Sequence, residues 1–237
     1  MVVLLGKTGA GKSATGNTIL GRKDFVSKKC SKSVTADIEK QNGTIEGTDL
    51  VVYDTPGFCK SDRSEEQIQE KFQDVLNPGP HAFLIVLRVN GRFTEQEKRA
   101  IELLESVFGS GLAKHAIILF THGDALEGNS LEKLIGGNRD LSRVVEQCGG
   151  RYHVLNNKAR GNRAQVTELM EKIDRMVEEN GGTCYTNEMF EDAARIKKEE
   201  EEKIQRERIQ REEEEGIQRE KEEEEERIQR EKERIER

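Results

Sequence analysis

The stretch GKTGAGKSATGNTIL, residues 6–20, contains the most informative pattern in this chain of 237 residues. It satisfies GxxxxGK[ST] at four positions, Gly6, Gly11, Lys12 and Ser13. A short apolar run precedes it and residues of helical composition follow, so we expect a strand, a loop and a helix in that order. In such a loop, successive backbone N–H groups point inward at a phosphate, which also lies at the positive end of the helix. The pattern therefore predicts a phosphate-binding loop.

Two further features predict a Mg²⁺ ion beside the phosphates. Lys12 is expected to neutralise the β- and γ-phosphates, while the Ser13 hydroxyl binds the metal. Farther along the chain, the tetrapeptide DTPG begins at Asp54, directly after an apolar run. Asp54 would hold the metal through water, and the Gly57 amide would contact the γ-phosphate. The alternative is an ordinary turn, because Asp, Pro and Gly are all turn residues.

The segment Thr121-His122-Gly123-Asp124 is a candidate for binding the nucleotide base, and it follows a strand-like apolar run. A carboxylate at Asp124 can accept from both the N1–H and the 2-amino group of guanine, a pattern that adenine does not present. The segment lacks the lysine of the usual NKxD motif, and capping of the next helix is the alternative role for Asp124. Asn156, after a later strand, is expected to bond the base edge from the other side or to form a simple turn.

A threonine is expected to close on Mg²⁺ and the γ-phosphate from the segment between the first helix and the next strand. Thr35 is the candidate, with Ser33 behind it, because Thr35 directly precedes a predicted strand. A surface threonine on that strand is the alternative.

Strands and helices alternate along the chain, which predicts an α/β fold with a mainly parallel sheet covered by helices on both faces. Strands are expected at residues 2–5, 34–41, 50–53, 82–89, 116–121 and 152–155, and helical segments at 12–20, 65–76, 94–108, 131–148 and 165–179. Asn42-Gly43 predicts a hairpin turn, and Thr94 with Glu97 predicts a capping box. Ligands of such sheets lie at the carboxyl ends of the strands, where all the motifs above fall.

Charge divides the chain into two parts. Residues 191–237 contain 20 acidic and 14 basic residues, a net charge of −6 out of −7 for the whole chain. The nearly neutral remainder shows no basic face, so a nucleic-acid surface is not expected. We predict a nucleotide-binding domain over residues 1–180, a linker over 181–190 and a charged helical tail over 191–237.

The tail repeats the sequence Ile-Gln-Arg-Glu at Ile204, Ile209, Ile217 and Ile228, with steps of five, eight and eleven residues. About one apolar residue per heptad is half of what a two-stranded coiled coil needs. Glutamate and arginine or lysine four residues apart instead favour a solvated single helix. A weak coiled coil is the alternative. The tail is expected to serve as a spacer, a partner helix or a docking surface for unknown protein partners.

Cysteine usage and hydropathy indicate where the protein works. The four cysteines show neither CxxC spacing nor a histidine at ligand spacing, so reduced thiols of a cytosolic protein are expected rather than zinc or disulfides. No apolar run reaches the roughly 18 residues that a membrane span needs. We therefore expect a cytoplasmic protein, or one held at the surface of an organelle membrane.

These motifs together resemble the GTPases of the immunity-associated protein (GIMAP) family, which have an AIG-type G domain. The similarity rests on GKTGAGKSATGNTILG, DTPGF, LRVNGRFTEQEKRAI and FTHGDAL, and it covers most of the chain from residue 2 to about residue 179. The resemblance implies a Ras-like P-loop GTPase fold with extra helices, GTP or GDP with Mg²⁺ as ligands, and a homodimer or oligomer formed across the nucleotide face. It also implies a role in immunity and, in some members, a C-terminal membrane anchor, which we do not expect within these 237 residues.

The family's characteristic box falls on residues 87–101, which implies a role for Arg92 as an arginine finger in a partner's site. Such a finger stabilises charge during phosphoryl transfer. A solvated loop arginine is the alternative.

Phe58 follows DTPG, in the neighbourhood where Ras-like hydrolases place a water-orienting glutamine. Phenylalanine cannot orient water, so slow hydrolysis by an isolated protomer is expected.

We therefore expect a Mg²⁺-dependent GTP-binding protein that dimerises and hydrolyses GTP slowly, with activation in trans. A nucleotide-gated scaffold with negligible hydrolysis is the alternative, while Asp124 argues against an ATP-dependent kinase. The predicted catalytic residues are Lys12, Thr35 and Arg92, and the predicted metal ligands are Ser13, Thr35 and Asp54. The predicted nucleotide-binding residues are Gly6, Thr8, Gly9, Ala10, Gly11, Lys12, Ser13, Ala14, Thr35, Asp54, Gly57, Thr121, His122, Asp124 and Asn156.

Overall fold

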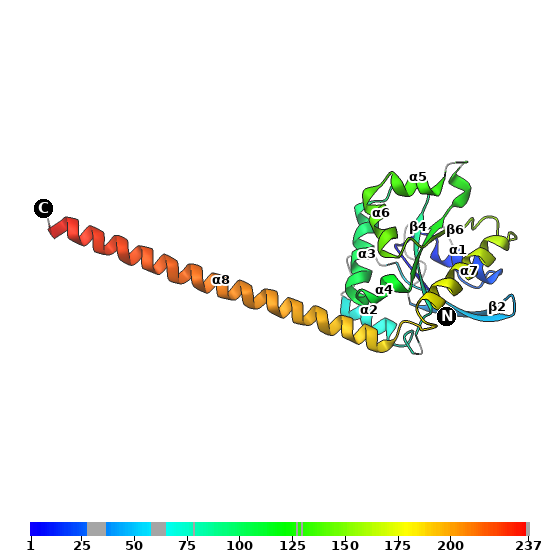
Figure 1. Ribbon diagram of the computed structural model, residues 1–237, viewed down its shortest axis with the longest axis horizontal. Helices are drawn as coiled ribbons and strands as arrows, with labels where there is room; N and C mark the ends of the chain where they lie inside the picture. Colours follow the sequence, from blue (N-terminus) through cyan, green and yellow to red (C-terminus); the bar gives the residue numbers. More distant parts are fainter. Residues whose placement is uncertain (28–36, 58–64, 78, 127, 129, 236–237) are drawn as a thin grey trace. The chain divides into compact units, whose positions relative to one another are not determined.

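The computed structural model describes residues 1–27, 37–57, 65–77, 79–126, 128 and 130–235. Within these residues six strands form one sheet in the order β2-β3-β1-β4-β5-β6. The strands are β1 (Val2–Leu5), β2 (Glu39–Ile45), β3 (Thr48–Asp54), β4 (Ala82–Arg88), β5 (Ala116–Thr121) and β6 (Tyr152–Val154). β2 pairs antiparallel with β3, whereas the other paired strands run parallel (Figure 1).

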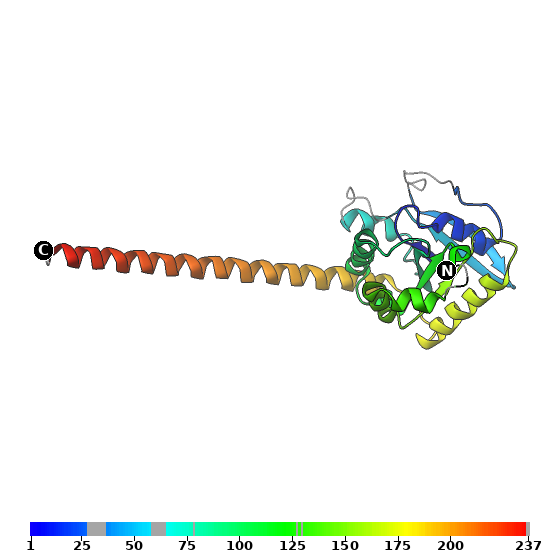
Figure 2. The same cartoon turned by 90° about the horizontal axis from the view of Figure 1, so that it is seen from above.

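Helices cover both faces of this sheet (Figure 1, Figure 2). One face is covered by α1 (Lys12–Leu20) and α7 (Ala164–Glu179), and the other by α2 (Glu65–Phe72), α3 (Glu95–Phe108), α4 (Gly111–Lys114), α5 (Leu131–Gly136) and α6 (Arg139–Gln147). Successive side chains of β1 divide between the two cores: Val3 and Leu5 pack with α2, α3 and α6, whereas Val2 and Leu4 pack with α1 and α7. Strands covered on both faces are apolar throughout, and the predicted mainly parallel α/β fold is confirmed.

The parallel register brings the ends of four strands to one edge of the sheet. Leu4 of β1 lies beside Asp54 of β3, and Arg88 of β4 lies beside Thr121 of β5. β1 and β4 are themselves paired in parallel, so these two pairs of strand ends are neighbours. The loops that follow β1, β3, β4 and β5 therefore lie together, at the edge where the sequence placed its motifs.

The hairpin between β2 and β3 turns later than the sequence predicted. Asn42-Gly43 lies within β2, paired with residues 50–51 of β3. The turn is made by Glu46-Gly47, both at positive φ (50° and 82°), as a type I′ turn requires. A Cβ at Gly43 would lie 2.7 Å from Leu20 Cδ2 at the end of α1. The prediction was wrong because Gly43 permits close packing of a helix against the strand rather than a turn.

The segment between α7 and the long helix α8 (Asn187–Ile235) belongs to the core. Tyr185 is fully buried, its ring contacts Phe83 and Phe108 edge-on, and its hydroxyl donates to the Phe108 carbonyl at 2.6 Å. Burial raises the pKa of the Tyr185 phenol, so this group remains a donor at neutral pH. Phe190 packs on Phe108 as well, with ring centroids 5.3 Å apart. Residues 181–190, expected to form a linker, thus contribute two aromatic rings to the core.

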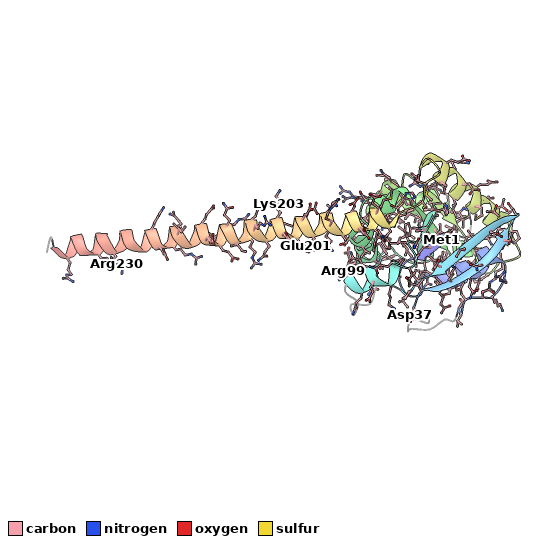
Figure 3. All side chains as sticks on the ribbon, turned by 90° about the horizontal axis from the view of Figure 1, so that it is seen from below. Met1, Asp37, Arg99, Glu201, Lys203 and Arg230 are labelled. Atoms are coloured by element: carbon pink, nitrogen blue, oxygen red, sulfur yellow. The ribbon has the colours of Figure 1, made fainter. Side chains whose placement is uncertain are left out.

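The chain divides into two compact units, Met1–Ala193 and Ala194–Arg237. The second unit is the charged part of α8, whose described side chains, such as Glu201 and Lys203, extend into solvent (Figure 3). Opposite charges four residues apart lie close together, for example Lys197 and Glu201 at 3.8 Å, and each such pair contributes about 0.3–0.5 kcal/mol. The predicted charged helix is confirmed. Neither α8 nor any other described helix combines the length and the apolar content that crossing a membrane requires.

Tyr185→Phe should lower the free energy of unfolding by about 1–2 kcal/mol, because the buried Phe108 carbonyl loses the hydrogen bond from the phenol. Tyr152→Phe is the matched control, since it removes a bond to Glu132 of 2.9 Å at an exposed position and should cost less than about 0.5 kcal/mol. Urea unfolding followed by circular dichroism measures both values. Equal losses for the two variants would contradict the role assigned to burial.

Candidate functional site

The glycine-rich loop joins β1 to α1 at the carboxyl edge of the sheet. Gly11 is the N-cap of α1 and has a φ of 104°, a conformation that residues with a Cβ rarely adopt. Among the described residues, no acidic side chain lies in the first turn of α1 and none caps it. The helix dipole therefore favours an anion at this turn, and no acidic side chain of α1 opposes it.

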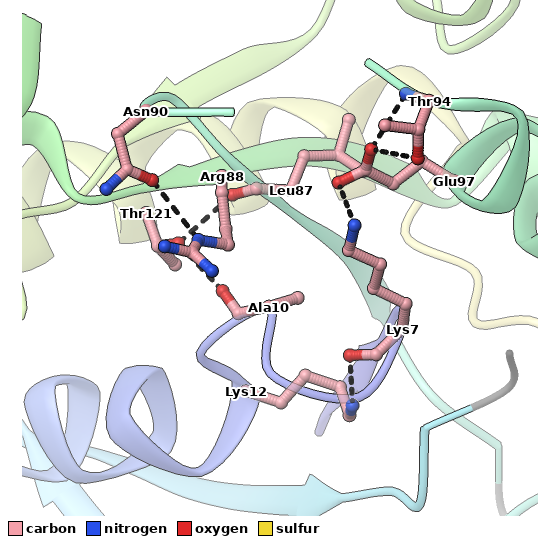
Figure 4. Close-up of polar contacts among 9 residues, drawn as sticks. All are labelled: Lys7, Ala10, Lys12, Leu87, Arg88, Asn90, Thr94, Glu97 and Thr121. Atoms are coloured by element: carbon pink, nitrogen blue, oxygen red, sulfur yellow. Dashed lines mark hydrogen bonds and ion pairs between the residues drawn. The ribbon is translucent and has the colours of Figure 1, made fainter. Parts of the chain in front are cut away.

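Lys12 reaches back from α1 across the loop. Lys12 is only 7% exposed, and its ammonium donates to the carbonyls of Gly6 at 3.0 Å and Lys7 at 3.1 Å. The second of these bonds is drawn in Figure 4. Burying a charge is costly unless it is hydrogen-bonded, and these carbonyls offset that cost. The ammonium is thereby held against the loop in which phosphates are expected.

Ser13 and Asp54 meet at the start of α1. The Ser13 hydroxyl donates to Asp54 Oδ2 at 2.5 Å, and Asp54 is 1% exposed. A hydroxyl and a carboxylate are the oxygen ligands that Mg²⁺ prefers, so this pair of donors fits the metal. The structure thus brings together two of the three predicted metal ligands. The third, Thr35, lies outside the described residues.

The DTPG segment lies directly against the phosphate loop. A Cβ added to Gly57 would lie 2.1 Å from Thr8 Oγ1 and 2.4 Å from the Thr8 nitrogen, so only glycine permits this approach. The Thr55 hydroxyl donates to the Leu4 carbonyl at 2.6 Å and fixes the segment to β1. The Thr8 hydroxyl is buried and has no hydrogen-bond partner among the described residues. A polar atom of a ligand would satisfy it.

Thr121 lies under the phosphate loop. Its buried hydroxyl is 2.7 Å from the Ala10 carbonyl and 3.1 Å from the Leu87 carbonyl, so it joins the loop to the end of β4 (Figure 4). The next residue, His122, has a φ of 61°, which is uncommon for a residue other than glycine. Its Nδ1 lies 3.1 Å from Thr121 Oγ1. This conformation turns the chain sharply after β5, toward Asp124.

Asp124 lies in a short 3₁₀ helix, η1 (Gly123–Leu126), and Lys158 joins it to Asn156 in the loop after β6. The Lys158 ammonium donates to the Asp124 carboxylate, and the Lys158 backbone N–H donates to the Asn156 side-chain oxygen at 2.9 Å. The hydrogen bond from Lys158 lowers the pKa of Asp124, which is therefore an ionised acceptor at neutral pH. Sequence reasoning missed Lys158. No motif marks it, because its contact with Asp124 joins residues 34 positions apart.

Two more residues that sequence reasoning missed anchor the Asn156 loop to α1. Asn157 Oδ1 accepts from the Thr18 hydroxyl at 2.8 Å. The Arg163 guanidinium donates to the carbonyls of Thr18 and Ile19 at 2.7 and 2.8 Å. These carbonyls lie in the last turn of α1, where a cation is favoured by the helix dipole. One helix therefore positions both the phosphate loop and the loop expected to contact the base.

Arg92 lies in an exposed loop between β4 and α3, which we call the Arg92 loop (residues 89–93). The loop borders a cavity of about 300 Å³, whose lining includes Leu87, Phe120 and Leu141. The structure thus presents Arg92 to solvent beside the end of β4. Phe58, the other residue considered for the hydrolytic step, lies outside the described residues.

Gly57→Ala should weaken the binding of Mg²⁺ and GTP at least tenfold, about 1.4 kcal/mol, because the new Cβ would displace the backbone of Thr8 in the phosphate loop. Gly161→Ala is the matched control, since a Cβ there meets nothing within 4 Å. Isothermal titration of the two variants and the wild type measures the affinities. Equal affinity in all three proteins would show that the contact between the DTPG segment and the loop is dispensable.

The fold is similar to that of solved structures of Toc33 from Arabidopsis thaliana. A dimerization-deficient arginine-to-alanine variant of that protein gives a TM-score of 0.58 at 19% identity, over 74% of this chain and 82% of that chain. The complex of Toc33 with Mg²⁺ and GMPPNP also gives a TM-score of 0.58, at 18% identity, over 75% of this chain and 84% of that chain. This similarity, with the sheet order described above, confirms the predicted Ras-like P-loop GTPase fold.

Curated relatives come from plants and mammals. Immune-associated nucleotide-binding protein 10 of Arabidopsis thaliana is 35% identical over 217 residues, 87% of this chain and 46% of its own length. Immune-associated nucleotide-binding protein 8 of the same plant is 39% identical over 216 residues, 85% of this chain and 61% of its own length. GTPase IMAP family member 8 of Homo sapiens is 35% identical over 192 residues, 78% of this chain and 29% of its own length. The chain thus spans about half the length of the plant relatives and less of the human one.

A model of the AIG1 family matches residues 1–208. The match includes the phosphate loop, the DTPG segment, the Arg92 loop and the segment that ends at Asp124. Together with the relatives above, it confirms the resemblance to GIMAP proteins that the motifs indicated. This chain belongs to the AIG1 family.

Proposed function

We propose that this protein binds GTP with Mg²⁺ and hydrolyses it to GDP and phosphate. The observation that supports this most strongly is the 2.5 Å contact between Ser13 and the buried Asp54 carboxylate beside the phosphate loop. A buried carboxylate so close to the phosphate loop would repel a bound phosphate unless a cation lay between them. The donor set therefore suits a metal–phosphate pair. The relatives, described as nucleotide-binding proteins and a GTPase, agree with this proposal.

Each residue of the phosphate side has a distinct part in the proposed reaction. The N–H groups of the first turn of α1 bind the phosphates, and the Lys12 ammonium exchanges its two carbonyl contacts for phosphate oxygens. Ser13 and Asp54 hold Mg²⁺, with Thr35 proposed as a further ligand. Bound Mg²⁺ would neutralise charge that develops on the phosphates. The Gly57 amide contacts the terminal phosphate, consistent with its place against the loop.

Asp124 is proposed to select guanine. An ionised carboxylate offers about four lone-pair sites, so it can accept from the N1–H and the 2-amino group while Lys158 remains bonded to it. The strained His122 conformation aims the segment, and Asn156 lies next to it through Lys158. Guanine rather than adenine is therefore the proposed base.

Hydrolysis is proposed to depend on a second copy of the chain. Arg92 is exposed, so it can reach a partner protomer and stabilise charge there as an arginine finger. An arginine-to-alanine variant of Toc33 is dimerization deficient, and dimerization is important for the GTPase activity of the chloroplast translocon components atToc33 and psToc159. By analogy we infer a homodimer whose nucleotide faces meet, with slow hydrolysis by the isolated protomer.

We infer that the charged tail contacts protein partners in the cytoplasm or at an organelle surface, in a process related to immunity. The description of a plant relative as an immune-associated protein supports the relation to immunity. Isoleucines of the tail are exposed, Ile204 by 65%, and they offer apolar contacts along a charged helix. Light scattering of the chain with and without residues 194–237 separates a coiled coil, which would lose assembly, from a spacer, which would not.

Asp124→Asn should weaken GTP binding at least tenfold, about 1.4 kcal/mol, because the amide presents one acceptor and brings donors against the donors of guanine. The same variant should bind xanthosine triphosphate more tightly than the wild type does, since xanthine has an oxygen in place of the 2-amino group. Competition against a fluorescent GDP measures both effects. Asp140→Asn, at an exposed aspartate of α6, is the control. Unchanged GTP affinity in Asp124→Asn would refute guanine recognition by this carboxylate.

The rate of GTP hydrolysis per protomer should rise with protein concentration, and at high concentration Arg92→Ala should be at least about 100-fold slower, because the partner's site loses its arginine finger. Arg99→Ala, which removes an exposed arginine of α3, is the matched control and should behave as the wild type. Phosphate release measures the rate, and light scattering follows assembly. A flat rate near zero with GTP still driving assembly would instead support a nucleotide-gated scaffold.

A further inference from the structure

Glu97 is a buried carboxylate in the first turn of α3 that reaches the phosphate loop. Its Oε1 lies 2.9 Å from the ammonium of Lys7, and the two side chains are 5% and 21% exposed (Figure 4). Lys7 occupies a position of the GxxxxGK[ST] pattern at which any residue is allowed. The pattern itself therefore does not require this ion pair.

The second oxygen of Glu97 closes the N-terminus of α3. Glu97 Oε2 accepts from the Thr94 N–H at 2.9 Å and from the Thr94 hydroxyl at 3.0 Å. This contact is part of the capping box that the sequence predicted. One carboxylate thus binds the phosphate loop with one oxygen and the residue that follows the Arg92 loop with the other.

The opposite end of the Arg92 loop is also attached to the phosphate loop. The Thr121 hydroxyl contacts the carbonyl of Leu87, near the end of β4, and the carbonyl of Ala10 in the phosphate loop. The Arg92 loop therefore runs between two attachments, Thr121 and Glu97, and each attachment contacts the phosphate loop directly.

We propose that Glu97 is a positioning residue for hydrolysis, which fixes the Arg92 loop relative to the phosphate loop so that Arg92 meets a partner's phosphates in the productive geometry. This inference rests on the proposed dimeric GTPase. Lys7 is the partner of Glu97 in this role. The Lys12 ammonium, which is proposed to bind the phosphates, donates to the Lys7 carbonyl at 3.1 Å. Lys7 therefore contacts both Lys12 and Glu97.

A surface pocket lies beside the Arg92 loop. Its lining includes Arg92 and Phe93 of the loop and Leu134 and Leu141 of the helices opposite, and its volume is about 300 Å³. The pocket is open to solvent and is lined partly by the exposed residues Gly91 and Arg92, so it leaves space into which the loop can shift. Misplacement of a catalytic group by about 1 Å lowers a rate about 100-fold. Glu97 itself lines the pocket, and in the proposed role its pair with Lys7 limits such shifts.

Capping alone does not account for a carboxylate at position 97. Glutamine serves at this position of a capping box as well as glutamate does, and a buried carboxylate has a large cost of desolvation. The contact with Lys7 and the N-terminal dipole of α3 both favour the negative charge, and of these only Lys7 links Glu97 to the phosphate loop. Glu97→Gln therefore removes the ion pair while keeping an acceptor for Thr94.

Glu97→Gln and Lys7→Met should each lower the rate of the dimeric protein about 10- to 100-fold. Nucleotide affinity should change less than twofold, because neither side chain is proposed to contact GTP. Lys7→Arg keeps the charge and should retain at least half of the wild-type rate. Lys98→Met is the matched control, because Lys98 forms an ion pair of 3.7 Å with Asp140 on the outer side of the same helix. This variant should hydrolyse GTP as fast as the wild type does.

Hydrogen exchange of residues 90–96 provides a readout that does not depend on hydrolysis. A bound non-hydrolysable GTP analogue should slow exchange there in the wild type and in Lys98→Met, but not in Glu97→Gln. If the wild type hydrolyses GTP without dependence on concentration or on Arg92, the proposed activation in trans fails. Equal protection in Glu97→Gln and in the wild type overturns the positioning role, whatever the rates.

Two other results would overturn the inference. Rates within twofold of the wild type in both Glu97→Gln and Lys7→Met would show that the ion pair does not position Arg92. A loss of rate accompanied by an equal loss of GTP affinity would show that Glu97 merely supports the phosphate loop. A lower rate at unchanged affinity, with recovery in Lys7→Arg, supports the proposal.

Discussion

The parallel pairing of β1 with β3 and β4 is the constraint on which the rest of the structure depends. β1 is only four residues long, yet it lies in the middle of the sheet, with side chains alternating between two cores. Because parallel strands end at the same edge, the loop after β1 lies beside Asp54 and close to Thr121. A shift of the register by one residue would reverse both faces of β1 at once, so core packing also fixes the position of the site.

Buried charges at this edge are arranged in compensating contacts. The Lys12 ammonium donates to two carbonyls of its own loop, Asp54 accepts from Ser13, and Glu97 binds both Lys7 and Thr94. An uncompensated charge in such surroundings costs several kcal/mol, so these contacts stabilise the folded domain. The same contacts restrict the positions of the groups that would bind a nucleotide. Stability and preorganisation therefore have a common physical origin here.

Helix α1 connects the two halves of the site. Its first turn faces the phosphate loop, whereas the carbonyls of its last turn accept from Arg163 in the loop after β6. Asn157 adds a bond to Thr18 in the same turn. The distance between the phosphate side and the base side is thus set by one rigid helix rather than by flexible loops, which suits a ligand of fixed length.

The local pattern of the sequence determined the phosphate loop, the alternation of strands and helices, the capping box at Thr94 and the charged helix at the end of the chain. These features depend on short-range spacing, and the structure contains each of them. The turn at Asn42-Gly43 was predicted wrongly, because Gly43 lies within β2 and packs closely against Leu20 of a different element. The contacts of Lys158 with Asp124, of Glu97 with Lys7 and of Tyr185 with Phe108 join residues 34, 90 and 77 positions apart. Only the tertiary structure decided these pairs, because the sheet brings such residues together and no local spacing records it.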